Sequence, residues 1–119
     1  MIYELREYVA MPGQGARLHA RFRDHTLALF ERHRLEVVGF WTDEADPERV
    51  VYLLRFPDRQ ALDQRWAAFK ADPDWQRVKA ESEADGPIVA EMTARELSSP
   101  AYWRSETAAA STSEGVAAR

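Results

Sequence analysis

Apolar side chains recur at helical spacing between residues 16 and 34. If Leu18 marks one face of a helix with about 3.6 residues per turn, then Phe22, His25, Leu29 and His33 fall on one narrow stripe. Most of the charged residues lie away from it. The pattern predicts a helix over residues 16–34 whose stripe, two histidines included, packs against a sheet.

Four other stretches have the alternation of β-strands, at residues 2–9, 35–43, 49–56 and 88–97. The first has two mixed faces, and one of these carries Glu4, Arg6 and Tyr8. The stretches 35–43 and 49–56 are apolar on both faces, which predicts that both faces are covered. The polar segment 43–48 between them, DEADPE, is typical of a hairpin loop.

A second helix is predicted over residues 59–70, with Asp58 as its N-cap. Leu62, Trp66 and Phe69 line one face of it at spacings of four and three residues. The segment 71–74 ends this helix, and a short helix follows over residues 75–84. Trp66 and Trp75 are interpreted as core residues.

The order β-α-β-β-α-β is that of a ferredoxin-like α+β fold, with a four-stranded antiparallel sheet and the helices on one face. The other face would leave a large apolar patch exposed. We therefore expect a homodimer that packs sheet against sheet as a dimeric α/β barrel with a cavity on the side away from the helices. The domain is expected to span residues 1–97.

Residues 98–119 are rich in Ser, Ala and Thr, and are expected to form a C-terminal tail that is largely disordered beyond about residue 107. Tyr102 and Trp103 stand side by side in this tail. We hypothesise that they dock on the domain.

Composition narrows the function classes further. The 119 residues contain no cysteine and carry a net charge of -4, which fits a cytoplasmic location and excludes a disulfide framework or thiolate metal site. No basic face is evident, so nucleic-acid binding is not expected. Neither a membrane span nor a secretory signal pattern is present, so no membrane association is expected.

Five segments together resemble a NIPSNAP domain of the dimeric α/β-barrel superfamily. They are YELREY (3–8) with Pro12-Gly13, FRDHTLALFERH (22–33), VVGFWT (37–42), VYLLRF (51–56) and the stretch 66–89. The resemblance implies the ferredoxin-like fold and a dimer, but no defined reaction. Relatives in the wider superfamily include cofactor-free monooxygenases, haem-degrading and dechlorinating enzymes, and small cyclases or lyases. Family members often have Gly after the helical His, where this chain has Arg34.

Glu4, Arg6 and Tyr8 are candidate catalytic residues because they share one strand face. In a barrel cavity, Arg6 would bind a carboxylate or enolate, Tyr8 would donate a proton, and Glu4 would act as a base. The alternative is a Glu4–Arg6 ion pair on a partly exposed edge. Alternation alone does not decide which face of this strand points inward.

His25 is the fourth candidate, either as a general acid or base or as a buried histidine that fixes the helix to the sheet. His33 would act as a cation at the helix end. Trp41, Tyr52 and Arg55 are candidate residues of a substrate cavity. No metal-binding or nucleotide-binding motif is present, so neither a metal nor a cofactor is expected.

Two functions remain open on these grounds. The first is a cofactor-independent enzyme of monooxygenase, cyclase, lyase or isomerase type that acts on an apolar or aromatic compound. The second is a non-catalytic module for ligand binding or dimerisation.

Overall fold

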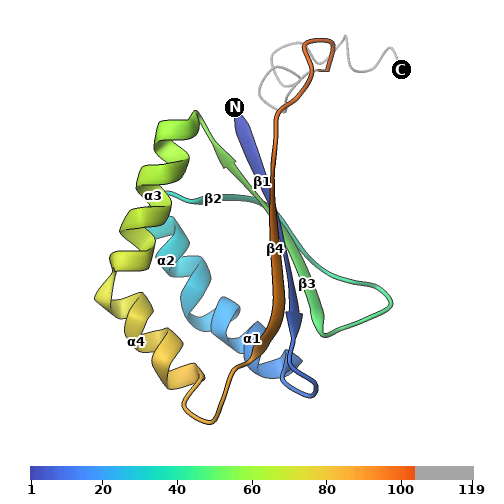
Figure 1. The fold of residues 1–119 in the computed structure, drawn as a ribbon, viewed down its shortest axis with the longest axis vertical. Coiled ribbons are helices and arrows are strands. Elements are labelled where there is room, and N and C mark those ends of the chain that lie inside the picture. The colour runs from blue at the N-terminus through green and yellow to red at the C-terminus, as the bar shows by residue number, and fades with distance from the viewer. Residues whose placement is uncertain (104–119) are drawn as a thin grey trace.

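The computed structural model describes residues 1–103 and has the expected ferredoxin-like α+β fold. Its sheet is antiparallel with the strand order β2-β3-β1-β4. Figure 1 shows all the helices on one side of this sheet. The strands are β1 (Ile2–Ala10), β2 (Glu36–Thr42), β3 (Arg49–Phe56) and β4 (Val89–Leu97), and the helical segments are α1 (Gly15–Arg21), the π-helix η1 (Phe22–Thr26), α2 (Leu27–Arg32), α3 (Arg59–Ala71) and α4 (Pro73–Ser82).

The core lies between the sheet and the helices, and strand β3 shows which of its two apolar faces contributes to it. Val50, Tyr52, Leu54 and Phe56 point toward the helices and are fully buried, whereas the side chains between them are only partly covered. The helices contribute the facing apolar surface, including the predicted Leu62, Trp66 and Phe69. The predicted N-cap is also confirmed, since Asp58 accepts a hydrogen bond from the Ala61 amide at 2.8 Å.

The first helical region is one continuous rod with a π-helical turn in the middle. The amide of Leu27 bonds to the carbonyl of Phe22, five residues back, instead of four. This wider turn shifts the phase of the helix, so Thr26 is buried and His25 is exposed. The prediction that His25 faces the sheet was therefore wrong, because it assumed an unbroken α-helical period.

The rod ends in a left-handed turn at Arg34, which has φ of 64°. The amide of Leu35 bonds to the carbonyl of Phe30 at 2.9 Å, and the amide of Arg34 bonds to that of Glu31 at 3.1 Å. These two bonds form a Schellman motif. Arginine therefore occupies the position where glycine would be least strained, and the chain still turns directly into β2.

No helix in the described part of the chain covers the sheet face away from the helical layer. This face carries Leu5, Val51 and Leu53, which are only partly buried, and Trp41, which is 53% exposed. A shift in register between Val37 and Gly39 moves Trp41 onto this face. Its ring lies over Gly39, where an added Cβ atom would come within 2.3 Å of it.

Strand β4 ends at Leu97, the expected end of the domain. Beyond it, Tyr102 is 88% exposed and Trp103 is 58% exposed. Tyr102 is thus not docked on the domain, contrary to our hypothesis. The predicted disorder beyond about residue 107 concerns residues outside the described part of the chain.

Candidate functional site

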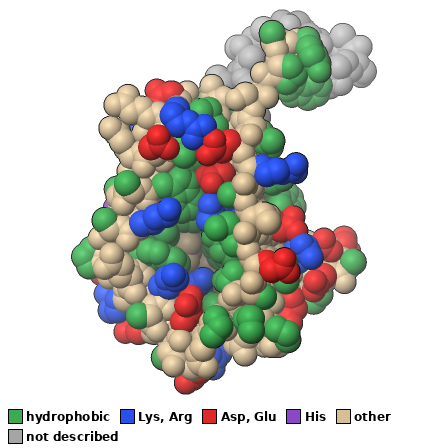
Figure 2. All heavy atoms as spheres, viewed as in Figure 1, with side chains coloured by type: hydrophobic (Ala, Val, Ile, Leu, Met, Phe, Trp, Pro, Cys, Tyr) green, Lys and Arg blue, Asp and Glu red, His purple; other side chains and the backbone are tan. Residues whose placement is uncertain are grey.

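A cavity of about 430 Å³ lies between the sheet and the helices. Figure 2 shows the opening as a hollow beside β4, with hydrophobic side chains inside it and basic side chains around it. Strand β1 supplies Arg6 and Tyr8 to the floor, and β4 supplies Val89 and Met92. The volume is within the range of small-molecule sites.

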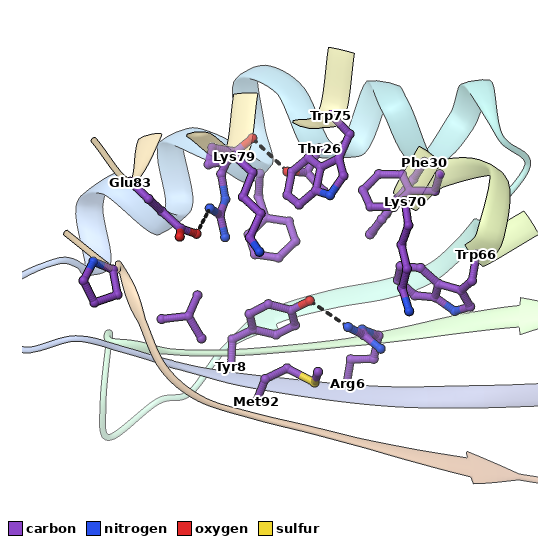
Figure 3. Close-up of a pocket in the computed structure, with 15 residues that line it drawn as sticks. Arg6, Tyr8, Thr26, Phe30, Trp66, Lys70, Trp75, Lys79, Glu83 and Met92 are labelled. Atoms are coloured by element: carbon purple, nitrogen blue, oxygen red, sulfur yellow. Dashed lines mark hydrogen bonds and ion pairs between the residues drawn. The ribbon is translucent and has the colours of Figure 1, made fainter. Parts of the chain in front are cut away.

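Arg6 is the centre of a hydrogen-bond network on the cavity floor, and Figure 3 shows its bond to Tyr8. Its guanidinium group donates to Glu4 Oε2 at 3.0 Å, to the Tyr52 hydroxyl at 2.9 Å and to the Tyr8 hydroxyl at 2.9 Å. The second oxygen of Glu4 accepts a hydrogen bond from the Trp66 indole at 2.6 Å. Both charged groups of the network, Arg6 and Glu4, have hydrogen-bond partners, which allows the ion pair between them to be buried.

The surroundings of Arg6 keep it charged. Burial acts to lower the pKa of its guanidinium group, but Tyr52, Tyr8 and Glu4 together outweigh burial and raise this pKa above its ordinary value. Burial raises the pKa of the Tyr52 hydroxyl well above its ordinary value, and Tyr8 adds to this increase while Arg6 opposes it. Tyr52 is therefore a neutral proton donor beside a fixed cation.

Tyr8 is the member of the network whose own proton is not used within it. Its oxygen accepts hydrogen bonds from Arg6 at 2.9 Å and from the Tyr52 hydroxyl at 3.2 Å. Because both bonds use its lone pairs, the Tyr8 O–H group is available to a molecule in the cavity. Tyr8 lines the cavity, whereas Tyr52 is fully buried beneath it.

Six of the fifteen residues that line the cavity are aromatic. Phe22 meets Tyr8 edge to face at 5.5 Å between ring centroids, and Phe30 meets Trp66 in the same way at 5.7 Å. Trp75 packs against Phe69 at 4.8 Å. Such a wall suits a flat apolar molecule, which can pack against ring faces and edges.

Basic side chains from the helices complete the site. Arg21 forms an ion pair with Glu83 at 2.9 Å, and its guanidinium group lies 5.3 Å from the Trp75 ring centroid. Lys70 and Lys79 extend from α3 and α4 toward the sheet (Figure 3). The cavity thus combines an apolar wall with positive charge.

The structure brings together four of the predicted site residues. Glu4, Arg6, Tyr8 and Tyr52 form the network described above. Their face of β1 points toward the helices, because Arg6 pairs with Tyr52 on the buried face of the sheet. The cavity they reach is therefore on the helix side. The barrel cavity expected on the opposite face of the sheet requires a second chain and stays a prediction.

The other three predicted residues lie elsewhere. His25 is exposed and lines a separate shallow depression on the outer side of the helices, with Arg17, Asp24 and Asp85. Trp41 and Arg55 lie on the far face of the sheet, where Arg55 pairs with Glu36. None of the three lines the cavity. The π-turn moves His25 outward, and strand register places Trp41 and Arg55 on the opposite face of the sheet.

Sequence reasoning missed the basic residues of the site. Arg21, Lys70 and Lys79 looked like ordinary solvated helix positions, and Trp66 and Trp75 were interpreted only as core. The sequence contains one sign that these two lysines are unusual. Of its 16 Lys and Arg residues, all are Arg except Lys70 and Lys79.

Within residues 1–103, no group of three side chains that could ligate a metal is found. No helix in this range is long and apolar enough to cross a membrane.

Comparison with known proteins agrees with the fold and defines its class. The structure is similar to an uncharacterised NIPSNAP-like domain protein from Burkholderia xenovorans, with a TM-score of 0.75 and 21% identity over 87% of this chain and 89% of that one. A NIPSNAP family protein from Agrobacterium tumefaciens has a TM-score of 0.74 and 16% identity over 85% of this chain and 94% of that one.

A more distant neighbour is an antibiotic biosynthesis monooxygenase, with a TM-score of 0.58 and 20% identity over 84% of this chain and 99% of that one. At these identities the likeness concerns the fold alone. These neighbours place the chain in the class of ferredoxin-like α+β domains. The family model for NIPSNAP matches residues 3–103, and the chain belongs to the NIPSNAP family. No curated protein matches the sequence.

Proposed function

We propose that the cavity is the active site of a small cofactor-independent enzyme that acts on an aromatic or otherwise flat apolar compound. The observation that carries the proposal is the Tyr8 hydroxyl, which is held by Arg6 and Tyr52 and keeps its own proton for a molecule in the cavity. A developing enolate oxygen or a phenolate oxygen of the substrate would accept this proton. The fixed charge of Arg6 would then stabilise the negative charge that the Tyr8 oxygen and the substrate oxygen share during the transfer.

The arrangement of Tyr8 and Arg6 is compatible with several reaction classes. A donor that stabilises an oxyanion serves monooxygenase, cyclase, lyase and isomerase chemistry alike, because each of these can pass through an enolate or phenolate. The fold shared with an antibiotic biosynthesis monooxygenase supports the first of these by analogy.

The test begins with native mass spectrometry of the purified protein to find molecules that co-purify with it. A recovered molecule is then incubated with the protein, and its conversion is followed by chromatography and mass spectrometry. We expect Tyr8→Phe to slow conversion at least 100-fold, as general acids typically contribute about 10²–10⁴-fold. Tyr3→Phe is the matched control, because Tyr3 lies on the other face of the same strand.

A second function, a non-catalytic ligand-binding module, is favoured by a different observation. Among residues 1–103, no histidine lines the cavity, and the one lining carboxylate, Glu83, is engaged by Arg21. A general base is thus missing from the cavity wall. A molecule that binds to the protein and to Tyr8→Phe alike, and is recovered unchanged from both, would support this function and contradict the first.

We also propose that the far face of the sheet is the interface of a homodimer. Leu5, Val51, Leu53 and Trp41 form an apolar patch there that no helix covers. Sedimentation at micromolar concentration is expected to give the mass of two chains, and Leu53→Lys should reduce it to one. Ala67→Lys, on the exposed side of α3, is the control that should leave the dimer intact.

A further inference from the structure

The chain has two lysines among its 16 basic residues, and both of them line the cavity. Lys70 lies in the last turn of α3 and Lys79 in the last turn of α4, so separate helices bring them to one opening. From this placement we propose that the cavity takes an aromatic organic anion, with its flat body against the rings and its anionic group beside the two lysines. This inference rests on the proposed function and names its substrate class.

The charge balance of the cavity is the first argument. Two of its four basic groups have carboxylate partners, since Arg6 pairs with Glu4 at 3.0 Å and Arg21 pairs with Glu83 at 2.9 Å. Within residues 1–103, neither lysine forms an ion pair with an acidic side chain. Two positive charges are thus unmatched at one opening of a chain whose net charge is -4.

The direction of the lysines is the second argument. Both extend from the helices toward the sheet instead of outward from the helix surface (Figure 3). The ammonium group of Lys70 lies 5.9 Å from the Trp66 ring centroid, so it is held near the aromatic wall. A flat anion in the cavity would meet both the rings and the ammonium groups. Such a placement of charge also attracts anions to the opening.

The chemistry of the Lys70 and Lys79 ammonium groups limits which anionic ligands they can distinguish. The guanidinium groups at the cavity already bind carboxylates, so the free charges are ammonium groups, which act as point charges without the planar fork of arginine. Recognition then depends on negative charge at the end of an apolar body more than on the geometry of one anionic group. A charged ligand and its neutral isostere therefore make the sharpest comparison.

The test measures the binding of 2-naphthoate and of its neutral isostere 2-naphthamide to the full chain by titration calorimetry. We expect naphthoate to bind roughly tenfold more tightly at low salt, because exposed ion pairs contribute modestly to affinity. The preference should decrease as salt is raised. In the double variant Lys70→Met/Lys79→Met it should disappear, while the affinity for naphthamide stays the same.

The matched control is Arg23→Met/Arg77→Met, which removes the same amount of charge from helix surfaces outside the cavity. This variant should keep the full preference for naphthoate. Equal binding of both probes to the wild-type protein would overturn the anion proposal and leave the proposed function intact. A preference that survives in the lysine variant would overturn it as well. If neither probe binds to the wild-type protein, the proposed function fails together with this inference.

A second measurement locates the ligand. Reductive ¹³C-methylation keeps the charge of lysine and labels only Lys70, Lys79 and the amino terminus, so the carbon spectrum has few signals. Naphthoate is expected to shift the lysine signals, and naphthamide to shift them less. Bound naphthoate that leaves both lysine signals in place would overturn the proposal.

Discussion

The indole N–H of Trp66 donates a 2.6 Å hydrogen bond to the carboxylate of Glu4, which joins helix α3 to the centre of the sheet. Glu4 is 5% exposed and uses its other oxygen to hold Arg6. The Arg6 guanidinium group in turn lies 4.4 Å from the Trp66 ring centroid. These three side chains form one unit, so the position of the cavity floor depends on all of them.

Removing Glu4 should therefore destabilise the whole domain. Glu4→Ala leaves a buried guanidinium group without its counterion and an indole N–H without its acceptor. We expect the free energy of unfolding to fall by about 3 kcal/mol, the lower end of what the loss of one partner of a buried pair costs. Urea denaturation followed by circular dichroism measures this difference.

Two comparisons separate this effect from the simple loss of a carboxylate. Glu7→Ala removes a neighbouring glutamate whose partner, Arg49, is partly exposed, and should cost less than about 1 kcal/mol. The double variant Glu4→Met/Arg6→Met removes both charges and should be more stable than Glu4→Ala alone. Equal losses for Glu4→Ala and Glu7→Ala would contradict the role of the buried pair.

The two tyrosines of the network should differ in what their hydroxyl groups do. Tyr52→Phe removes a fully buried hydroxyl and leaves Arg6 Nε without an acceptor, so the free energy of unfolding should fall by about 1–2 kcal/mol. Tyr8→Phe should cost less, because water in the cavity can replace the lost partner of Arg6. Thermal denaturation of both variants tests the order, and a greater loss for Tyr8→Phe would contradict it.

The fold was predictable because the strand and helix patterns follow one another in the order β-α-β-β-α-β, which is that of a ferredoxin-like fold. The two apolar faces of β3 did not show which one meets the helices. The structure places Leu54 and Phe56 on the helix side, with Arg6 opposite Tyr52 on the same side. The order of helices and strands followed from turn signals and capping residues such as Asp58. Strand alternation, turn signals and helix caps therefore all predicted the same order of elements.

The site was only partly predictable, for three physical reasons. A π-turn has no clear signature in sequence, so His25 was placed on the wrong side of its helix. The mixed faces of β1 did not reveal that Arg6 points toward the helices. Lys70 and Lys79 line the same cavity only through the packing of α3 and α4, which no local pattern records.

The π-turn makes a prediction of its own at Thr26. Its hydroxyl is buried and donates a hydrogen bond to the carbonyl of Arg21 at 3.2 Å. Thr26→Val keeps the shape of the side chain but leaves that carbonyl without this donor, so the free energy of unfolding should fall by about 1 kcal/mol. Urea denaturation gives the value.

Thr26→Ser is the matched control, because it keeps the hydroxyl and loses only a methyl group. It should lie closer to the wild type than Thr26→Val does. His25→Ala, on the adjacent exposed position, should change stability by less than about 0.5 kcal/mol. A large loss at His25 with none at Thr26 would contradict the phase of the helix described above.

Asp72 links the C-terminal end of α2 to the start of α4 and should give the domain a pH-dependent stability. Its carboxylate lies 2.6 Å from His33 Nε2, caps α4 through the Asp74 amide at 2.8 Å, and accepts from Arg32 at 2.8 Å. The hydrogen bond with His33 is the largest cause that lowers the pKa of Asp72 from 3.8 to about 2, followed by the Asp74 amide and then Arg32.

A carboxyl group whose pKa is lower in the folded state stabilises that state above its unfolded pKa and loses this effect as the folded pKa is approached. The stabilisation by Asp72 is therefore complete above about pH 4 and decreases between about pH 4 and pH 2. Asp72→Asn keeps an oxygen that can cap α4 but removes the charge. We expect the wild type to melt at a higher temperature than Asp72→Asn at pH 6, and this gap to narrow steadily from pH 4 to pH 2. Melting curves across this range measure it, and a gap that stays constant would show that the charge of Asp72 contributes nothing to the joint between the helices.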